Sequence, residues 1–121
     1  MEDKKMLGSR GEDMACSFLK DKGCKILKRN ERNRLGEMDI IARERKGTLV
    51  FVEVKTMREG DLTPEDQVSR KKINNMRKSA ELFAGEHERL IIEKAGWRID
   101  LIAITLKRDG SSLVRHYEQV V

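Results

Sequence analysis

Aromatic residues, prolines and long apolar runs are all scarce in this chain of 121 residues. Aromatics make up 4% of the chain, which argues against a base-stacking surface of the kind found in RRM and OB domains. There is one proline, and no stretch is dominated by Gly, Ser or Pro, so the sequence indicates no linker. We therefore expect a single domain over residues 1–121.

No apolar run approaches the roughly 18 residues needed to cross a bilayer. The first residues, Met-Glu-Asp-Lys-Lys, lack the apolar region of a signal peptide. These absences predict a cytoplasmic protein without a membrane partner. The two cysteines, Cys16 and Cys24, match no zinc or redox spacing, and we expect Cys16 to be a small buried side chain. His87 and His116 fit no recognisable metal pattern.

Charge, in contrast, is plentiful. Lys and Arg number 26 against 21 Asp and Glu, which gives a formal net charge of +5. A basic surplus favours polyanionic partners through phosphate contacts and counterion release. With few aromatics to stack on bases, the backbone and shape of a nucleic acid are the expected targets.

Hydrophobic periodicity predicts an α/β fold, a mixed five-stranded sheet flanked by helices in the order α-β-β-β-α-β-β. One expected helix, residues 9–22, begins with a Ser9–Glu12 capping box. The other, residues 64–84, is capped by Thr63 and ends at Gly85. A short helix is expected within residues 87–95, strands at residues 24–29, 37–42, 48–55, 97–106 and 113–120, and a basic turn at residues 30–34.

The clearest segment is a β-hairpin whose two arms flank Lys46-Gly47. Side chains on a strand alternate between faces, so the valines at positions 50, 52 and 54 form a core face, while Glu53 and Lys55 point the other way. An antiparallel register centred on Lys46 places Asp39 opposite Glu53. Two carboxylates at that distance need compensating positive charge, of which Lys55 can supply a part and a divalent metal ion the rest.

Carboxylate oxygens suit Mg²⁺ (or Mn²⁺), which commonly takes one or two carboxylates and keeps several waters. An ion held by Asp39 and Glu53 could activate water, and Lys55 could offset charge in the transition state of phosphodiester hydrolysis. The alternative is a solvated salt bridge, because Glu-x-Lys on a strand is common. Glu12 either adds a third carboxylate or serves only as the capping-box acid. Glu37 either assists the site or pairs with Arg34, and we favour the pairing.

Five basic side chains are candidates for contact with a nucleic-acid backbone. Arg32, Arg34 and Arg58 flank the ends of the hairpin, and Arg70 and Lys71 lie on the second long helix. The alternative for the helix is an ordinary solvated face.

With these residues in view, the chain resembles the YraN-type uncharacterised family, a branch of the PD-(D/E)xK nucleases related to Holliday junction resolvases. The likeness rests on Gly11-Glu12, on Arg34-x-Gly36-Glu37-x-Asp39-x-Ile41-Ala42, on Val50-Phe51-Val52-Glu53-Val54-Lys55, on Pro64-Glu65 with Val68, and on Arg98-Ile99-Asp100. It departs from that family where Met57 separates Thr56 from Arg58.

The resemblance implies a restriction-endonuclease-like fold, metal binding by Asp39 and Glu53, a catalytic Lys55, and Glu12 as the helix acid of resolvases. We therefore predict a Mg²⁺-dependent endonuclease that cleaves structured or branched DNA, and a homodimer if the substrate is a four-way junction. One alternative is a non-catalytic nucleic-acid-binding module that retains the nuclease fold. Another is an accessory subunit that meets its substrate through a protein partner.

Overall fold

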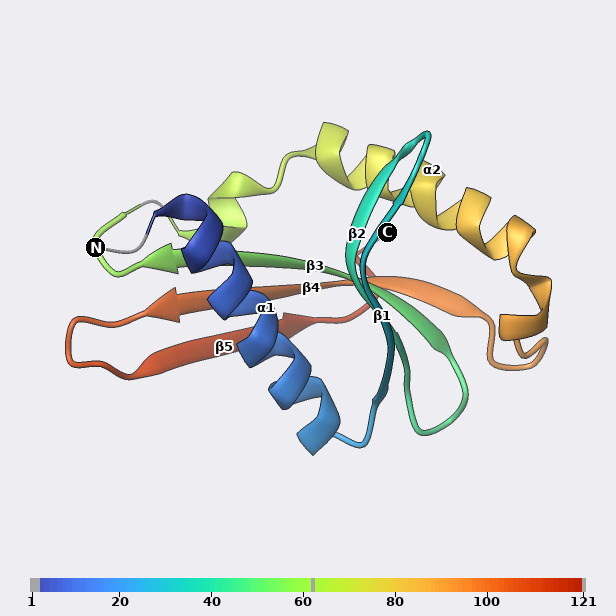
Figure 1. Ribbon diagram of the computed structural model, residues 1–121, viewed down its shortest axis with the longest axis horizontal. Coiled ribbons are helices and arrows are strands. Elements are labelled where there is room, and N and C mark those ends of the chain that lie inside the picture. Colours follow the sequence, from blue (N-terminus) through green and yellow to red (C-terminus); the bar gives the residue numbers. More distant parts are fainter. Residues whose placement is uncertain (1–2, 62, 121) are drawn as a thin grey trace.

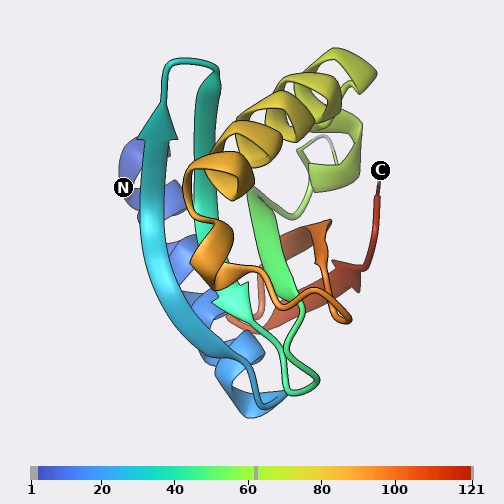
Figure 2. The ribbon, with the colours of Figure 1, turned by 90° about the vertical axis from the view of Figure 1, so that its right-hand side faces the viewer.

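The computed structural model describes residues 3–61 and 63–120, which form a sheet with one long helix on each face (Figures 1 and 2). The helices are α1 (Lys4–Asp21), the 3₁₀ helix η1 (Pro64–Gln67), α2 (Arg70–Glu86) and the 3₁₀ helix η2 (Glu88–Leu90). The strands are β1 (Lys25–Asn33), β2 (Gly36–Arg43), β3 (Leu49–Arg58), β4 (Trp97–Leu106) and β5 (Ser112–Tyr117). The predicted fold class is confirmed.

The five strands lie in the order β1-β2-β3-β4-β5. Neighbouring strands are antiparallel except β3 and β4, which run parallel. A parallel pair needs a long crossover, and α2 supplies it. The central strand β3 is therefore covered on both faces, by α1 on one side and by α2 on the other (Figure 2).

Two apolar clusters fill the spaces between the sheet and the helices. The α1 side contains Val50, Val52 and Val54, as predicted, packed against helix residues that include Leu19. The α2 side contains Leu49, Phe51, Met76, Ala80 and Phe83. The two clusters hold β3 from both faces, so its charged end projects from a rigid strand.

Helix α1 begins earlier than predicted, because the side chain of Asp3 caps it by accepting from the amide of Met6 at 2.8 Å. Ser9 lies inside the helix, so the predicted Ser9–Glu12 capping box is wrong. Gly11 lets α1 approach β3 closely: a Cβ there would lie 1.7 Å from Thr56 Oγ1. At residue 11 this helix therefore packs directly against the strand that carries Glu53 and Lys55.

The predicted helix over residues 64–84 is two helices. Thr63 caps only η1, and Val68 then takes an extended conformation. Ser69 starts α2 afresh by accepting from the amide of Lys72 at 3.1 Å. Helix α2 continues through Gly85 to Glu86, one residue beyond the predicted stop, and η2 is the short helix expected after it.

The strand predictions are confirmed with shifted ends. Strand β1 runs through most of the predicted turn and reverses at residues 34–35, with Asn30 in a left-handed conformation at φ 52°. Strand β5 is shorter than predicted and lies at an edge of the sheet. Cys16 is buried, as expected. Within residues 3–61 and 63–120, no helix has both the length and the apolar character to cross a bilayer.

Candidate active site

The β2–β3 hairpin has the register predicted from its turn, with Ile40 paired to Val52 and Ala42 to Val50. Continued by one residue, that register places Asp39 across from Glu53. The ladder stops at Ile40, however, and Asp39 Oδ2 accepts a hydrogen bond from the amide of Val54 at 2.8 Å. From this point β2 continues with β1 alone and rises away from β3 (Figure 1). The parting of the two strands opens a pocket.

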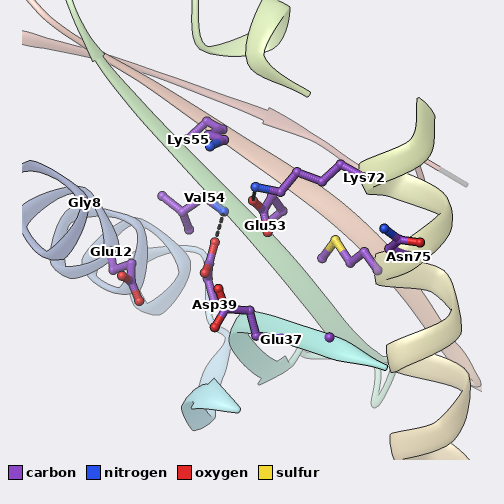
Figure 3. A pocket seen from close by; sticks show the side chains of 11 residues that line it. Gly8, Glu12, Glu37, Asp39, Glu53, Val54, Lys55, Lys72 and Asn75 are labelled. Atoms are coloured by element: carbon purple, nitrogen blue, oxygen red, sulfur yellow. Dashed lines mark hydrogen bonds and ion pairs between the residues drawn. The ribbon is translucent and has the colours of Figure 1, made fainter. Parts of the chain in front are cut away.

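This pocket, of about 380 Å³, receives side chains from both helices and both strands (Figure 3). It is lined by Gly8 and Glu12 of α1, Gly36, Glu37 and Asp39 of β2, Glu53, Val54 and Lys55 of β3, and Lys72, Asn75 and Met76 of α2. The four residues predicted to be catalytic, Glu12, Asp39, Glu53 and Lys55, all line it. The structure thus brings together side chains that lie far apart in the sequence.

Asp39 carries the strongest electrostatic perturbation in the pocket. Burial and the neighbouring charge of Glu53 raise its pKa from 3.8 to about 7, and the hydrogen bond from Val54 offsets only part of this. Glu53 is itself buried, but the ammonium of Lys72 lies 2.7 Å from its Oε1. Glu53 therefore has a cation partner, whereas Asp39 keeps its proton up to about neutral pH.

Glu12 reaches into the same pocket from α1 (Figure 3). Burial raises its pKa, although Arg29 opposes the shift, and its Oε1 is buried with no hydrogen-bond partner among the described residues. An unpartnered buried carboxylate oxygen is costly unless a cation or water meets it. Even so, no three Asp, Glu, His or Cys side chains in residues 3–61 and 63–120 lie close enough together to hold an ion.

Two lysines flank the carboxylates. Burial lowers the pKa of Lys55, and the nearby Lys72 lowers it further. For Lys72 burial acts in the same downward direction, but the ion pair with Glu53 outweighs it and raises the pKa. The predictions did not include Lys72. Its spacing in the sequence indicates its position, because residue 72 is one helical turn before the buried Met76 and so lies on the side of α2 that faces the sheet.

The candidate nucleic-acid contacts are dispersed. Arg32 pairs with Glu37 at 2.8 Å, so the predicted pairing of Glu37 with Arg34 is wrong. Arg34 is exposed in the turn between β1 and β2, and Arg70 and Lys71 are exposed in the first turn of α2. Arg58 lies at the end of β3, where it lines a separate hollow with Arg10, Glu59, Leu106, Lys107, Arg108, Gly110 and Ser111.

A second polar cluster surrounds Asp100 on β4, which is fully buried. It accepts from Arg98 at 3.0 Å, from the amide of Gln119 at 2.9 Å, and lies 2.8 Å from Nε2 of His116. Burial would raise the pKa of Asp100, but these hydrogen bonds hold it below its ordinary value. His116, which matched no pattern in the sequence, thus helps to join β5 to β4.

The family described as "Uncharacterised protein family UPF0102" matches residues 11–104, a range that contains Glu12, Asp39, Glu53 and Lys55. A UPF0102 protein of Syntrophomonas wolfei is 40% identical over 111 residues, which are 91% of this chain and 92% of that relative. A UPF0102 protein of Thermotoga neapolitana is 45% identical over 96 residues, which are 79% of this chain and 84% of the relative.

Among solved structures, that of Pyrococcus furiosus SfsA in complex with Ca²⁺ is similar to this chain with a TM-score of 0.40 and 17% sequence identity. The match covers 96% of this chain and 64% of the SfsA chain. Similarity at this level carries no argument about function.

Proposed function

This chain belongs to the UPF0102 family, and from that premise and the pocket between β2 and β3 we propose that it is a metal-dependent endonuclease. Residues 1–121 would act as one nuclease-like domain that hydrolyses phosphodiester bonds in structured or branched DNA in the cytoplasm. The observation that carries the proposal is the convergence of Asp39, Glu53 and Lys55 on one pocket, with the pKa of Asp39 raised to about 7.

The acids fit a hard divalent cation. Asp39 and Glu53 are neighbouring carboxylates. Burial and repulsion from Glu53 raise the pKa of Asp39, so a nearby cation would stabilise its charged form. Oε1 of Glu12, which meets no hydrogen-bond partner within residues 3–61 and 63–120, adds a further acceptor at the edge of the pocket. Mg²⁺ commonly takes one or two protein carboxylates and fills its other positions with water, so two acids suffice. Mn²⁺ accepts the same oxygen donors.

The chain's own residues have distinct roles in this proposal. Asp39 and Glu53 would hold the ion, whose chemistry is to lower the pKa of bound water and to polarise a phosphoryl oxygen. Lys55 would place its ammonium against the phosphate and offset the charge that develops there. Glu12 would orient water from the α1 side, where its Oε1 lacks a hydrogen-bond partner among the described residues.

The basic hollow at the end of β3 supports a nucleic-acid backbone as the substrate. Arg10, Arg58, Lys107 and Arg108 surround it, with Glu59 as the one acid of its lining. Arg58 is three residues beyond Lys55, roughly 10 Å along a strand. Because the two side chains point to opposite faces of β3, a duplex whose backbone passes around the end of the strand would place phosphates at both the pocket and the hollow. If the substrate is a four-way junction, cleavage of both strands calls for a homodimer.

The test is Mn²⁺ binding followed by cleavage. Calorimetry should show an ion bound by the wild type, and both D39N and E53Q should lose it. Labelled four-way junctions, flaps and linear duplexes should then be cleaved by the wild type only when Mg²⁺ or Mn²⁺ is present. Metal binding that is indifferent to both substitutions would exclude the pocket as the metal centre.

A non-catalytic nucleic-acid-binding module is the second candidate. It is favoured by the Lys72–Glu53 ion pair, which neutralises one acid without a metal, and by the lack of a three-residue ligand cluster among the described residues. Such a module would bind DNA with strong salt dependence, cleave none of the substrates, and bind equally well as wild type and as K55A.

A further inference from the structure

Lys72 occupies the position at Glu53 where a cation is needed. Its Nζ lies 2.7 Å from Glu53 Oε1, and the Glu53 side chain is 10% exposed. Figure 3 shows the lysine extending from α2 across the pocket to this carboxylate. The pair joins α2 to β3 at the centre of the proposed metal centre.

The same carboxylate oxygen cannot serve both partners at full strength. An ion bound to Glu53 would lie close to the Lys72 ammonium, and like charges at a few ångströms repel strongly in a half-buried site. The Lys72 ammonium contacts Glu53 and lies beside Lys55, and the Lys72 side chain is 41% exposed, so the ammonium can turn toward solvent without disturbing the core. Binding of the ion and retention of the ion pair are therefore competing states.

We propose that Lys72 is a resident counter-cation, which neutralises Glu53 in the metal-free protein and must be displaced when a divalent ion binds. The inference rests on the proposed function, because it assigns the competing ligand at the same centre. It makes Lys72 a residue that weakens metal affinity, whereas Asp39 and Glu53 strengthen it. A merely structural lysine would not have this effect.

The experiment is calorimetric titration of the full chain with Mn²⁺ alone. K72M keeps the aliphatic stem and removes the charge, and K72R keeps the charge. K78M is the matched control, because Lys78 is an exposed lysine on the same helix and does not line the pocket. We expect K72M to bind Mn²⁺ roughly fivefold to tenfold more tightly than the wild type, with K72R and K78M within about twofold of it.

A double variant identifies the acid through which Lys72 acts. In an E53Q background, which we expect to lose the ion, K72M should not restore Mn²⁺ binding, because the carboxylate for which Lys72 and the ion compete is absent. Because Lys72 is half-exposed, K72M should fold, and circular dichroism with urea unfolding checks this. Mn²⁺ binding that K72M restores in the E53Q background would contradict competition at Glu53.

The outcomes separate this inference from the proposed function. Wild type that binds Mn²⁺ with K72M equal or weaker overturns the counter-cation and leaves the nuclease proposal standing. Binding by K72M but not by the wild type supports the counter-cation in its strongest form. Absence of binding by both proteins overturns both proposals.

Discussion

Two aspartates of one sheet, Asp100 fully buried and Asp39 partly buried, have pKa values shifted in opposite directions. Asp100 is fully buried, yet its pKa is held low because Arg98, His116 and the amide of Gln119 all meet its oxygens. Asp39 is more exposed to solvent than Asp100, yet burial and Glu53 raise its pKa to about 7. Burial alone therefore does not decide the state of a carboxylate. Whether a buried carboxylate is charged also depends on the hydrogen-bond donors and cations around it. A carboxylate with too few of them is a candidate site for binding a cation.

The two clusters also differ in the elements that they connect. Arg98 contacts Glu44 at 3.1 Å as well as Asp100, and His116 Nδ1 lies 2.9 Å from the ammonium of Lys22. These contacts tie together α1, β4 and β5, as a structural centre would. The Asp39–Glu53 pocket opens instead where β2 and β3 part, and its acids remain incompletely neutralised.

The largest effect should come from Lys55. K55M should lower the cleavage rate about 1,000-fold at saturating Mn²⁺, because it removes a positive group from the site of developing charge. DNA affinity in Ca²⁺ should change less than threefold, as measured by fluorescence anisotropy. A K55M protein that cleaves at the wild-type rate would remove Lys55 from the mechanism.

Removing the acid of the satisfied cluster should cost stability. D100N should lower the free energy of unfolding by about 3 kcal/mol, because the buried Arg98 and His116 lose their shared carboxylate. Urea unfolding measures this change. The matched control is E118Q, since Glu118 is 58% exposed and lies 3.5 Å from Arg98, and it should change stability by less than about 0.5 kcal/mol.

The same substitution in the unsatisfied pocket should have the opposite sign. The folded protein binds the proton of Asp39 more tightly than the unfolded chain does. The protonated side chain therefore contributes its full stabilisation to the fold below about pH 4, and this contribution is lost as the pH rises through about 7. Metal-free D39N needs no proton and can still accept from Val54. It should be more stable than the wild type at pH 8, by about 2 kcal/mol, and equal to it below pH 4. If D39N and the wild type are equally stable at both pH values, the pKa of Asp39 is not raised in the folded protein.

The smallest effect should come from the basic hollow. R108Q should weaken DNA binding and reduce the slope of log affinity against log salt by about 1, because one phosphate contact is lost. K94Q is a control, since Lys94 is exposed and does not line the hollow. An unchanged salt slope for R108Q would place the DNA elsewhere.

The sequence predicted the parts of the site that depend on local geometry. Alternation along β3 and the position of its turn were enough to place Glu53 and Lys55 on one face and Asp39 across from them. It did not predict that the ladder ends at Ile40, because alternation along a strand does not report where the strand leaves its neighbour; before Ile40, β2 pairs with β1 alone.

Longer-range features escaped prediction for a related reason. The break at Val68 was missed because Ser69, which caps α2, lies inside a run that also has helical periodicity. The contact between His116 and Asp100 depends on the pairing of β4 with β5, and no residue spacing in the sequence reports it. Lys72 was missed because its partner lies on a strand that only the packing of α2 brings near.

The close approach of α1 to β3 at Gly11 has a consequence for the acid beside it. Since a Cβ at residue 11 would overlap Thr56, the helix can lie at this depth only with glycine there. Glu12 is the next residue, so one methyl group at position 11 would withdraw its carboxylate from the pocket while leaving its charge intact. Gly11→Ala would thus change how far the carboxylate of Glu12 extends into the pocket without replacing Glu12 itself.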